Sequence, residues 1–184
     1  MPHMIGEHVM LREYRQQDFE HIRKWVNDRS STEFLSAIFW FPQTEADTTD
    51  FLNRALRAAP NAAYFVIADV NDESYIGQMD IFEINWKIRK GKLGTVIGNA
   101  QARGKGYGTE ALMLLQDYAF GVLGLERLEL EVYADNTRAV RCYEKAGFIR
   151  EGTCRHAAMV NGKYADVHIM AVIKEDWEKK NAEK

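Results

Sequence analysis

Apolar positions along the chain follow two alternating periods, one of about two residues and one of about 3.6 residues. The shorter period predicts strands over residues 9–12, 64–68, 75–84, 93–98, 128–132, 149–160 and 165–173. The longer period predicts amphipathic helices that begin after Asp18, after Thr44, from Gly108 and after Asn136. The resulting order, β-α-α-β-β-β-α-β-α-β-β, indicates an α+β protein.

Turn and stop signals separate these elements. Pro60, Gly124 and Gly147 are placed to end helices, because proline lacks the backbone donor and glycine tolerates the left-handed conformation of a helix end. The pairs Asn71-Asp72 and Asn161-Gly162 predict tight turns between strands. The strands on either side of each turn are therefore expected to pair antiparallel.

Length and composition indicate one domain over residues 1–184, with residues 1–4 before the first element and residues 178–184 as a tail. Hydrophobic residues make up 46% of the chain, which is enough for one core. The net charge of −3 comes without a basic block, no apolar run approaches the roughly 20 residues of a membrane span, and residues 1–4 lack signal-peptide features. We expect a cytoplasmic protein with neither nucleic acid nor membrane as partner.

The cysteines and histidines favour neither a disulfide framework nor a metal site. The chain has two cysteines, Cys142 and Cys154, which we expect to be thiols because no secretory signal accompanies them. The five histidines are scattered and do not recur with cysteine at zinc-ligand spacing. No metal is expected.

The most informative segment is the glycine-rich stretch from Gln101 to Gly108, which lies between a predicted strand and a predicted helix. Gly104, Gly106 and Gly108 allow the backbone to turn with several N–H groups facing the same way, beside the partial positive charge of a helix N-terminus. This arrangement predicts a phosphate-binding loop. A glycine-rich turn without a ligand is the alternative.

Two common nucleotide motifs do not fit this loop. The Walker loop requires G-x-x-x-x-G-K followed by Ser or Thr, whereas Lys105 lies between two glycines. The dinucleotide motif requires G-x-G-x-x-G after a first strand, whereas the spacing here is G-x-G-x-G past the middle of the chain.

The pattern Q-x-x-G-x-G before a helix resembles the acyl-CoA pyrophosphate loop of the GCN5-related N-acetyltransferases, the GNAT superfamily. The resemblance extends from Ile5 to about Trp177 and is most specific at residues 93–115 and 132–148. The opening residues 6–14 with Asp18, and the closing residues 161–166, are most similar to the branch of ribosomal-protein alanine and spermidine acetyltransferases.

The resemblance implies a GNAT acyl-CoA N-acyltransferase fold of αβα layers, with a mixed, mostly antiparallel central sheet flanked by helices. Its fourth and fifth strands, ending near Ile97 and Val132, are expected to splay apart so that acetyl-CoA lies between them. Unpaired backbone groups in such a gap need partners, which the amides of pantetheine supply. The implied cofactor-binding residues are Val96, Ile97, Gln101, Arg103, Gly104, Lys105, Gly106, Tyr107, Gly108, Thr109, Asn136 and Tyr143.

Tyr143 matches the family position whose phenol points toward the sulfur of acetyl-CoA, so the resemblance implies that it is the general acid. A core aromatic is the alternative. Asn136 matches a cofactor-contacting asparagine, although the role of helix N-cap is sufficient to explain it.

A general base is harder to assign, because Lys92 occupies the place where many related enzymes carry a glutamate. Asp80 and Glu83 remain candidates, although charged residues on a strand face are more often only solvated. Lys92 itself is expected to be a surface lysine.

The acceptor pocket is expected between the two N-terminal helices, the segment 34–42 and the hairpin at Asn161. Phe34, Phe39, Trp40 and Phe41 either pack in the core, which is the favoured interpretation, or line this pocket, and Trp86 poses the same choice.

The leading hypothesis is an enzyme that moves acetyl from acetyl-CoA to a primary amine by direct attack in a ternary complex. The acceptor is a polyamine, another small amine such as an amino sugar or aminoglycoside, or a protein N-terminus. A catalytically silent acyl-CoA-binding module and a non-CoA interaction protein are the alternatives. Family members are often dimers, so a homodimer is one assembly that the resemblance allows.

Overall fold

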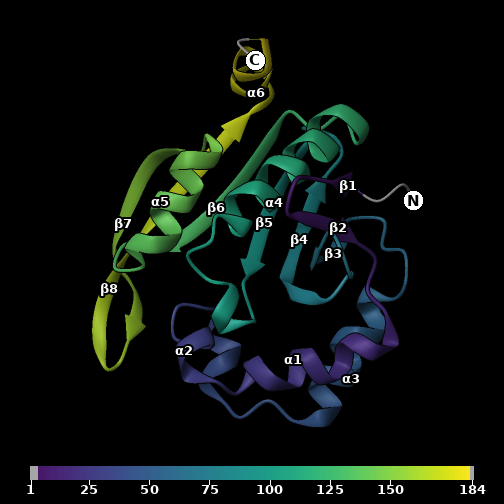
Figure 1. The fold of residues 1–184 in the computed structure, drawn as a ribbon. Coiled ribbons are helices and arrows are strands. Elements are labelled where there is room, and N and C mark those ends of the chain that lie inside the picture. The colour runs from purple at the N-terminus through teal and green to yellow at the C-terminus, as the bar shows by residue number, and fades with distance from the viewer. Residues whose placement is uncertain (1–3, 183–184) are drawn as a thin grey trace.

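The computed structural model describes residues 4–182. Figure 1 shows a twisted sheet with helices on both faces, and eight strands of the described residues join in the order β1-β2-β3-β4-β5-β6-β8-β7. The strands are β1 Met4–Ile5, β2 Val9–Arg12, β3 Ala63–Asp69, β4 Tyr75–Asn85, β5 Lys90–Val96, β6 Arg127–Tyr133, β7 Ile149–Val160 and β8 Lys163–Ile173. The α-helices are α1 Phe19–Val26, α2 Arg29–Thr32, α3 Glu45–Ala55, α4 Tyr107–Gln116, α5 Thr137–Ala146 and α6 Lys174–Ala182.

The sheet is split near its centre. Neighbouring strands pair antiparallel except β5 and β6, which are parallel and are joined by three residue pairs, Lys90 with Arg127, Gly91 with Leu128 and Lys92 with Glu129. Beyond these pairs β5 stays with β4 and β6 stays with β8, so the two strands diverge. This divergence confirms the predicted splay, at the strands that the sequence analysis counted fourth and fifth.

Two hydrophobic clusters hold the helices to opposite faces of the sheet. Leu112 and Leu115 of α4 and Ala146 of α5 pack with the larger cluster, which includes Leu11, whereas the neighbouring Met10 faces the smaller one. The smaller cluster joins strands β2 to β4 to helices α1 and α3. Residues alternate between the two clusters along a strand because successive side chains point to opposite faces.

Short elements absent from the predicted order complete the fold. Met4 belongs to β1 and residues 178–182 belong to α6, so neither stretch is a simple flank or tail, whereas residues 1–3, 183 and 184 lie outside the described residues. Short 3-10 turns lie at η1 Gln16–Asp18, η2 Ala37–Trp40 and η3 Ala100–Ala102, and α4 continues as a π-turn, η4 Asp117–Val122.

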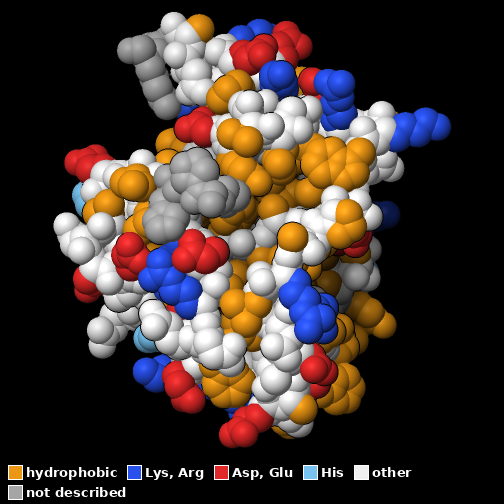
Figure 2. Space-filling model, turned by 90° about the vertical axis from the view of Figure 1, so that its right-hand side faces the viewer, with side chains coloured by type: hydrophobic (Ala, Val, Ile, Leu, Met, Phe, Trp, Pro, Cys, Tyr) orange, Lys and Arg blue, Asp and Glu red, His pale blue; other side chains and the backbone are white. Residues whose placement is uncertain are grey.

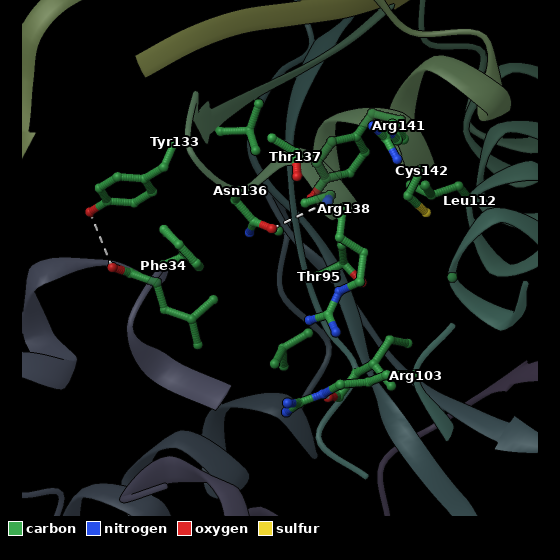
Figure 3. Close-up of a pocket in the computed structure, with 18 of the residues that line it drawn as sticks. Phe34, Thr95, Arg103, Leu112, Tyr133, Asn136, Thr137, Arg138, Arg141 and Cys142 are labelled. Carbon is green, nitrogen blue, oxygen red and sulfur yellow. Dashed lines mark hydrogen bonds between the residues drawn. The ribbon is translucent and has the colours of Figure 1, made fainter. Parts of the chain in front are cut away.

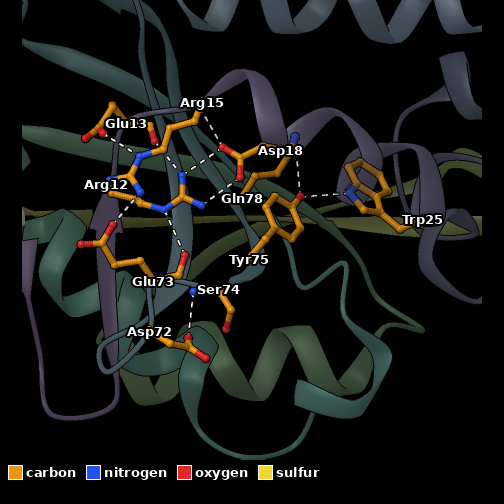
Figure 4. Close-up of polar contacts among 10 residues, drawn as sticks. All are labelled: Arg12, Glu13, Arg15, Asp18, Trp25, Asp72, Glu73, Ser74, Tyr75 and Gln78. Atoms are coloured by element: carbon orange, nitrogen blue, oxygen red, sulfur yellow. Dashed lines mark hydrogen bonds and ion pairs between the residues drawn. The ribbon is translucent and has the colours of Figure 1, made fainter.

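The prediction that Asp18 caps α1 is wrong. Its carboxylate accepts two hydrogen bonds from the Arg12 guanidinium, at 2.9 and 2.8 Å, and one from the Arg15 backbone N–H at 2.7 Å (Figure 4). Arg12 and Asp18 are each 1% exposed. Arg12 also donates to the backbone carbonyl oxygens of Glu13 and Glu73. The ion pair therefore fastens the loop before α1 to β2 and to the turn between β3 and β4.

The surface carries both signs of charge. Figure 2 shows lysine and arginine side chains interspersed with aspartate and glutamate over the face that it displays, together with an apolar area in its upper half. Within residues 4–182, no helix has the length and apolar character required to cross a membrane.

We predict that Asp18→Asn lowers the free energy of unfolding by about 3–5 kcal/mol, because the Arg12 charge stays buried without its partner. The melting temperature, measured by circular dichroism, should fall by about 10 °C. Glu73→Gln removes the half-exposed pair of Glu73 with Arg15 at 2.6 Å and is the control, with a change of about 0–1 kcal/mol. Equal effects of the two variants would contradict this role of the buried pair.

Candidate functional site

A cavity of about 670 Å³ opens where β5 and β6 diverge. Gly94 and Thr95 of β5 line it, as do Val132 and Tyr133 of β6. Since consecutive strand residues face opposite sides of a sheet, the cavity passes through the sheet rather than resting on one face. The view in Figure 3 looks into this cavity, with α5 on one side and the segment around Phe34 on the other.

The glycine loop forms one end of the cavity. Gly104 and Gly106 have φ angles of 78° and 88°, and a Cβ at either position would meet nothing within 4 Å, so the loop faces open space. Gly106 precedes the first turn of α4, where no side chain accepts a hydrogen bond from the backbone N–H groups. Free N–H groups at a helix N-terminus are suited to bind an anion, so the geometry of the loop is compatible with the predicted phosphate-binding role. The helix begins at Tyr107, one residue earlier than expected.

Basic side chains surround the same end. The basic residues among the lining are Arg103, Arg138, Arg141 and Lys145. Arg103 and Arg138 enter from opposite walls (Figure 3), and burial, with the nearby Arg138 charge, lowers the pKa of Arg103. Like charges in one cavity favour an anionic ligand between them. The residues present therefore fit the diphosphate and phosphate groups of coenzyme A.

Arg103 is already engaged by the protein. Its guanidinium donates to the Ile97 carbonyl oxygen at 3.0 Å, to the Ser30 carbonyl oxygen at 3.2 Å and to the Ser31 hydroxyl at 2.5 Å. These contacts tie the glycine loop to α2. Among residues 4–182, by contrast, Arg138 has neither a hydrogen-bond nor an ion-pair partner, so its guanidinium is free to bind a ligand.

Most of the predicted cofactor-binding residues line this cavity. They are Val96, Ile97, Arg103, Gly104, Gly106, Gly108, Thr109, Asn136 and Tyr143. Gln101, Lys105 and Tyr107 are not among the lining residues. Gln101 and Lys105 are exposed, and the Tyr107 ring lies 6.3 Å from the ring of His8.

Tyr143 and Asn136 reach the cavity from α5. Tyr143 is 8% exposed and packs edge-on against Phe148, and burial raises its pKa above the usual value, so the phenol stays protonated at neutral pH. Asn136 is also the N-cap of α5, because its side-chain oxygen accepts a hydrogen bond from the Ala139 N–H at 3.2 Å. The two roles that the sequence allowed for Asn136 are therefore compatible.

The carboxylates considered as general base lie elsewhere. Glu83 forms an ion pair with Lys92 at 2.8 Å, and the Tyr14 hydroxyl donates to Asp80 at 3.5 Å. Neither carboxylate is among the residues that line the cavity. The lining contains one carboxylate within the described residues, Glu131 of β6, whose signal in the sequence is only the apolar–polar alternation of that strand.

The aromatic segment packs as core only in part. Trp40 and Phe41 are 58% and 72% exposed, so the favoured interpretation is wrong for these two residues, whereas Phe39 packs on Trp25. Phe34 lines the main cavity and lies 6.0 Å, ring to ring, from Tyr133. A second cavity of about 630 Å³ lies beyond α2, and Glu33, Trp40, Phe41 and Met159 are among its lining residues. Trp86 is exposed and donates to the Pro60 carbonyl oxygen at 2.8 Å.

A cavity that crosses a split sheet, with basic residues and an uncapped helix N-terminus in its lining, fits an elongated phosphorylated ligand. The described fold is similar to that of spermidine N-acetyltransferase from Vibrio cholerae in complex with CoA and spermine, with a TM-score of 0.81, 25% identity, and coverage of 92% of this chain and 98% of that one.

Sequence comparison agrees with the fold. Spermidine N(1)-acetyltransferase of Vibrio cholerae is 27% identical over 171 residues, which cover 92% of this chain and 95% of that protein. A probable N-acetyltransferase of Bacillus subtilis is 35% identical over 114 residues, covering 61% and 62% of the two chains. Residues 8–149 match the family described as acetyltransferase (GNAT) domain, and the chain belongs to this family. It is an N-acetyltransferase whose acetyl donor is acetyl-CoA.

We predict that Arg138→Gln weakens CoA binding about tenfold, because it removes a charge-assisted contact to phosphate. Arg103→Gln should leave the Kd for CoA within about twofold, since its guanidinium serves the protein. Titration calorimetry measures the Kd for CoA of both variants at low and at high salt. The effect of Arg138→Gln on this Kd should be smaller at high salt, which screens the charge. A larger loss from Arg103→Gln than from Arg138→Gln would contradict this division of roles.

A second prediction concerns Asp80, whose burial raises its pKa to about 7 despite hydrogen bonds from Tyr14 and the Phe65 backbone. The pKa of an unfolded aspartate is near 3.9, so protonated Asp80 contributes fully to folding stability below about pH 4. This contribution is lost as the pH rises through 7 and the buried carboxyl ionises. Asp80→Asn should remove a fall of about 2–4 kcal/mol across that window, measured by urea unfolding at several pH values. An identical pH slope in the variant would refute the assignment.

Proposed function

We propose that the chain transfers acetyl to a primary amine by direct attack in a ternary complex, with acetyl-CoA bound from the α4–α5 side and the amine from the side of α2. The cavity that passes through the sheet is the observation that carries this proposal, because it lets two substrates meet inside the gap. Transfer without a covalent enzyme intermediate needs such a meeting point.

The divergent parts of β5 and β6 supply the binding groups for the extended donor. Leu93, Val96 and Val132 lie beyond the last paired residues of their strands and also line the cavity. Backbone N–H and C=O groups there lack the partners that a continuous sheet provides. An elongated ligand with amide groups pairs with them and thereby closes the sheet.

Tyr143 carries the proton transfer in this proposal. Acetyl-CoA supplies an activated thioester carbonyl. The neutral amine nitrogen forms the new bond to the carbonyl carbon, the carbon–sulfur bond breaks, and the Tyr143 hydroxyl gives its proton to the leaving thiolate. The proton that the nitrogen loses passes through solvent and restores the Tyr143 hydroxyl. The raised pKa of Tyr143 supports this role, since a phenol that ionised near neutral pH would have no proton to give.

The acceptor is a primary amine. The names of the Vibrio cholerae relative and of the similar structure support polyamines as candidates. Other small amines and protein N-termini remain candidates from the family resemblance. A panel of amines, with released CoA thiol as the readout, tests the proposal. Turnover of one or more amines is expected. Acetyl-CoA binding without turnover across the panel would favour the silent acyl-CoA-binding module.

We predict that Tyr143→Phe lowers kcat about 10²-fold and leaves the Kd for acetyl-CoA nearly unchanged, because only the proton donor is lost. Tyr133→Phe is the matched control. Tyr133 also lines the cavity, but its hydroxyl donates to the Leu35 carbonyl oxygen at 3.3 Å. The kcat of Tyr133→Phe should stay within about threefold of the wild-type value. Equal kcat values for wild type and Tyr143→Phe would remove the general-acid role.

A further inference from the structure

Most charged side chains on the strands beside the gap between β5 and β6 form ion pairs with one another. Lys92 pairs with Glu83 at 2.8 Å, and Glu129 is bound by Lys90 at 2.8 Å and by Arg127 at 3.0 Å. Lys92 and Glu129 are paired across β5 and β6, so their side chains lie on the same face of the sheet. This is the face that α1 and α3 cover over the strands on the other side of β5. The carboxylates of Glu83 and Glu129 are thus already neutralised.

Glu131 is the exception on this face. It follows Glu129 by two residues on β6, so its side chain points the same way, and it lies past the last paired residues of β5 and β6. Within residues 4–182 it has neither an ion-pair partner nor a hydrogen-bond partner. The hydrogen bond that Lys92 donates to Glu83 raises the pKa of Lys92, and the negative charges of Glu83, Glu131 and Glu129 raise it further. An unpaired carboxylate in a substrate cavity is positioned to meet a cation.

The rest of this side of the cavity is apolar or neutral. Phe34 and Leu35 approach from the segment after α2, and Ala157 and Ala158 from β7. Among the basic lining residues, Arg138, Arg141 and Lys145 come from α5, on the side where CoA brings about four negative charges, whereas Arg103 joins the glycine loop to α2. Glu131 is the one carboxylate of the described lining, and so the one negative charge there that is available to a cationic acceptor.

We propose that the acceptor carries a single ammonium group beside an apolar or aromatic body, rather than the several ammonium groups of a polyamine. Glu131 is the partner of that ammonium as it binds, and the ammonium then gives one proton to solvent and attacks as the neutral amine. The inference rests on the proposed function and deepens it. A second or third ammonium of a polyamine would lie against Phe34, Leu35 and the two alanines, and a charge that loses water without gaining a partner opposes binding.

The test compares two amines at saturating acetyl-CoA, with released CoA thiol as the readout. 2-Phenylethylamine has one charge and an aromatic body, and spermidine has three charges. The wild-type kcat/KM should be at least about tenfold higher for 2-phenylethylamine, a difference of about 1.4 kcal/mol in transition-state binding. A higher kcat/KM for spermidine would overturn the inference.

Glu131→Gln should lower kcat/KM for 2-phenylethylamine at least about 30-fold while the Kd for acetyl-CoA stays within about twofold. Glu33→Gln is the matched control, because Glu33 lines the second cavity across α2. It should leave both amines unaffected. Unchanged kinetics in Glu131→Gln would refute the role of Glu131, and a specific loss of spermidine turnover in Glu33→Gln would indicate a polyamine that spans both cavities.

A gain of function provides a further arm. Ala157 lines the apolar side and is exposed, so Ala157→Glu adds a second carboxylate without removing a contact in the core. The kcat/KM for spermidine should rise relative to 2-phenylethylamine. An unchanged ratio would count against a charge-based choice of acceptor.

Acetyl-CoA binding without acetylation of any amine would reject the proposed function itself, whereas turnover with a preference for spermidine would reject the single-charge inference alone.

Discussion

The functional arrangement of this protein depends on the break between β5 and β6. Three residue pairs join the strands, after which each strand follows a different antiparallel neighbour. Backbone groups that would be satisfied in a continuous sheet are left available, and a cavity opens where the core would otherwise close. The glycine loop follows β5 directly and α5 follows β6, so both reach the same opening.

The two sides of that opening differ in the charge of the groups that line them. The helix N-terminus at Gly106 and the free Arg138 form an anion site on one side, and Glu131 introduces a lone negative charge on the other. Tyr143 also lines the cavity, and burial raises its pKa so that the phenol stays protonated at neutral pH. A reaction that joins an anionic donor to a cationic acceptor thus finds opposite fields at the two entrances, and the field at each entrance favours the substrate that enters there.

Features determined by local sequence were predictable. The hairpin signal at Asn161-Gly162, the helix stop at Gly147 and the glycine loop all depend on a few neighbouring residues, and each lies as expected. Features determined by residues distant in the sequence were not predictable. Asp18 has the residue type of a helix cap, but Arg12 from β2 binds its carboxylate. Trp40 and Phe41 have core composition but lie over a cavity. Glu131 was visible only as one member of an alternating strand, and its importance comes from its position beyond the last paired residues.

The contacts of Arg103 have a consequence for how the two substrates are aligned. Its guanidinium joins the glycine loop, where we propose that the donor binds, to Ser30 and Ser31 of α2, on the proposed acceptor side. The two proposed subsites are therefore linked by hydrogen bonds of the folded chain. The relative orientation of donor and acceptor is set when the protein folds, so each substrate enters a frame already aligned with the other, and the entropy lost in bringing them into register is smaller.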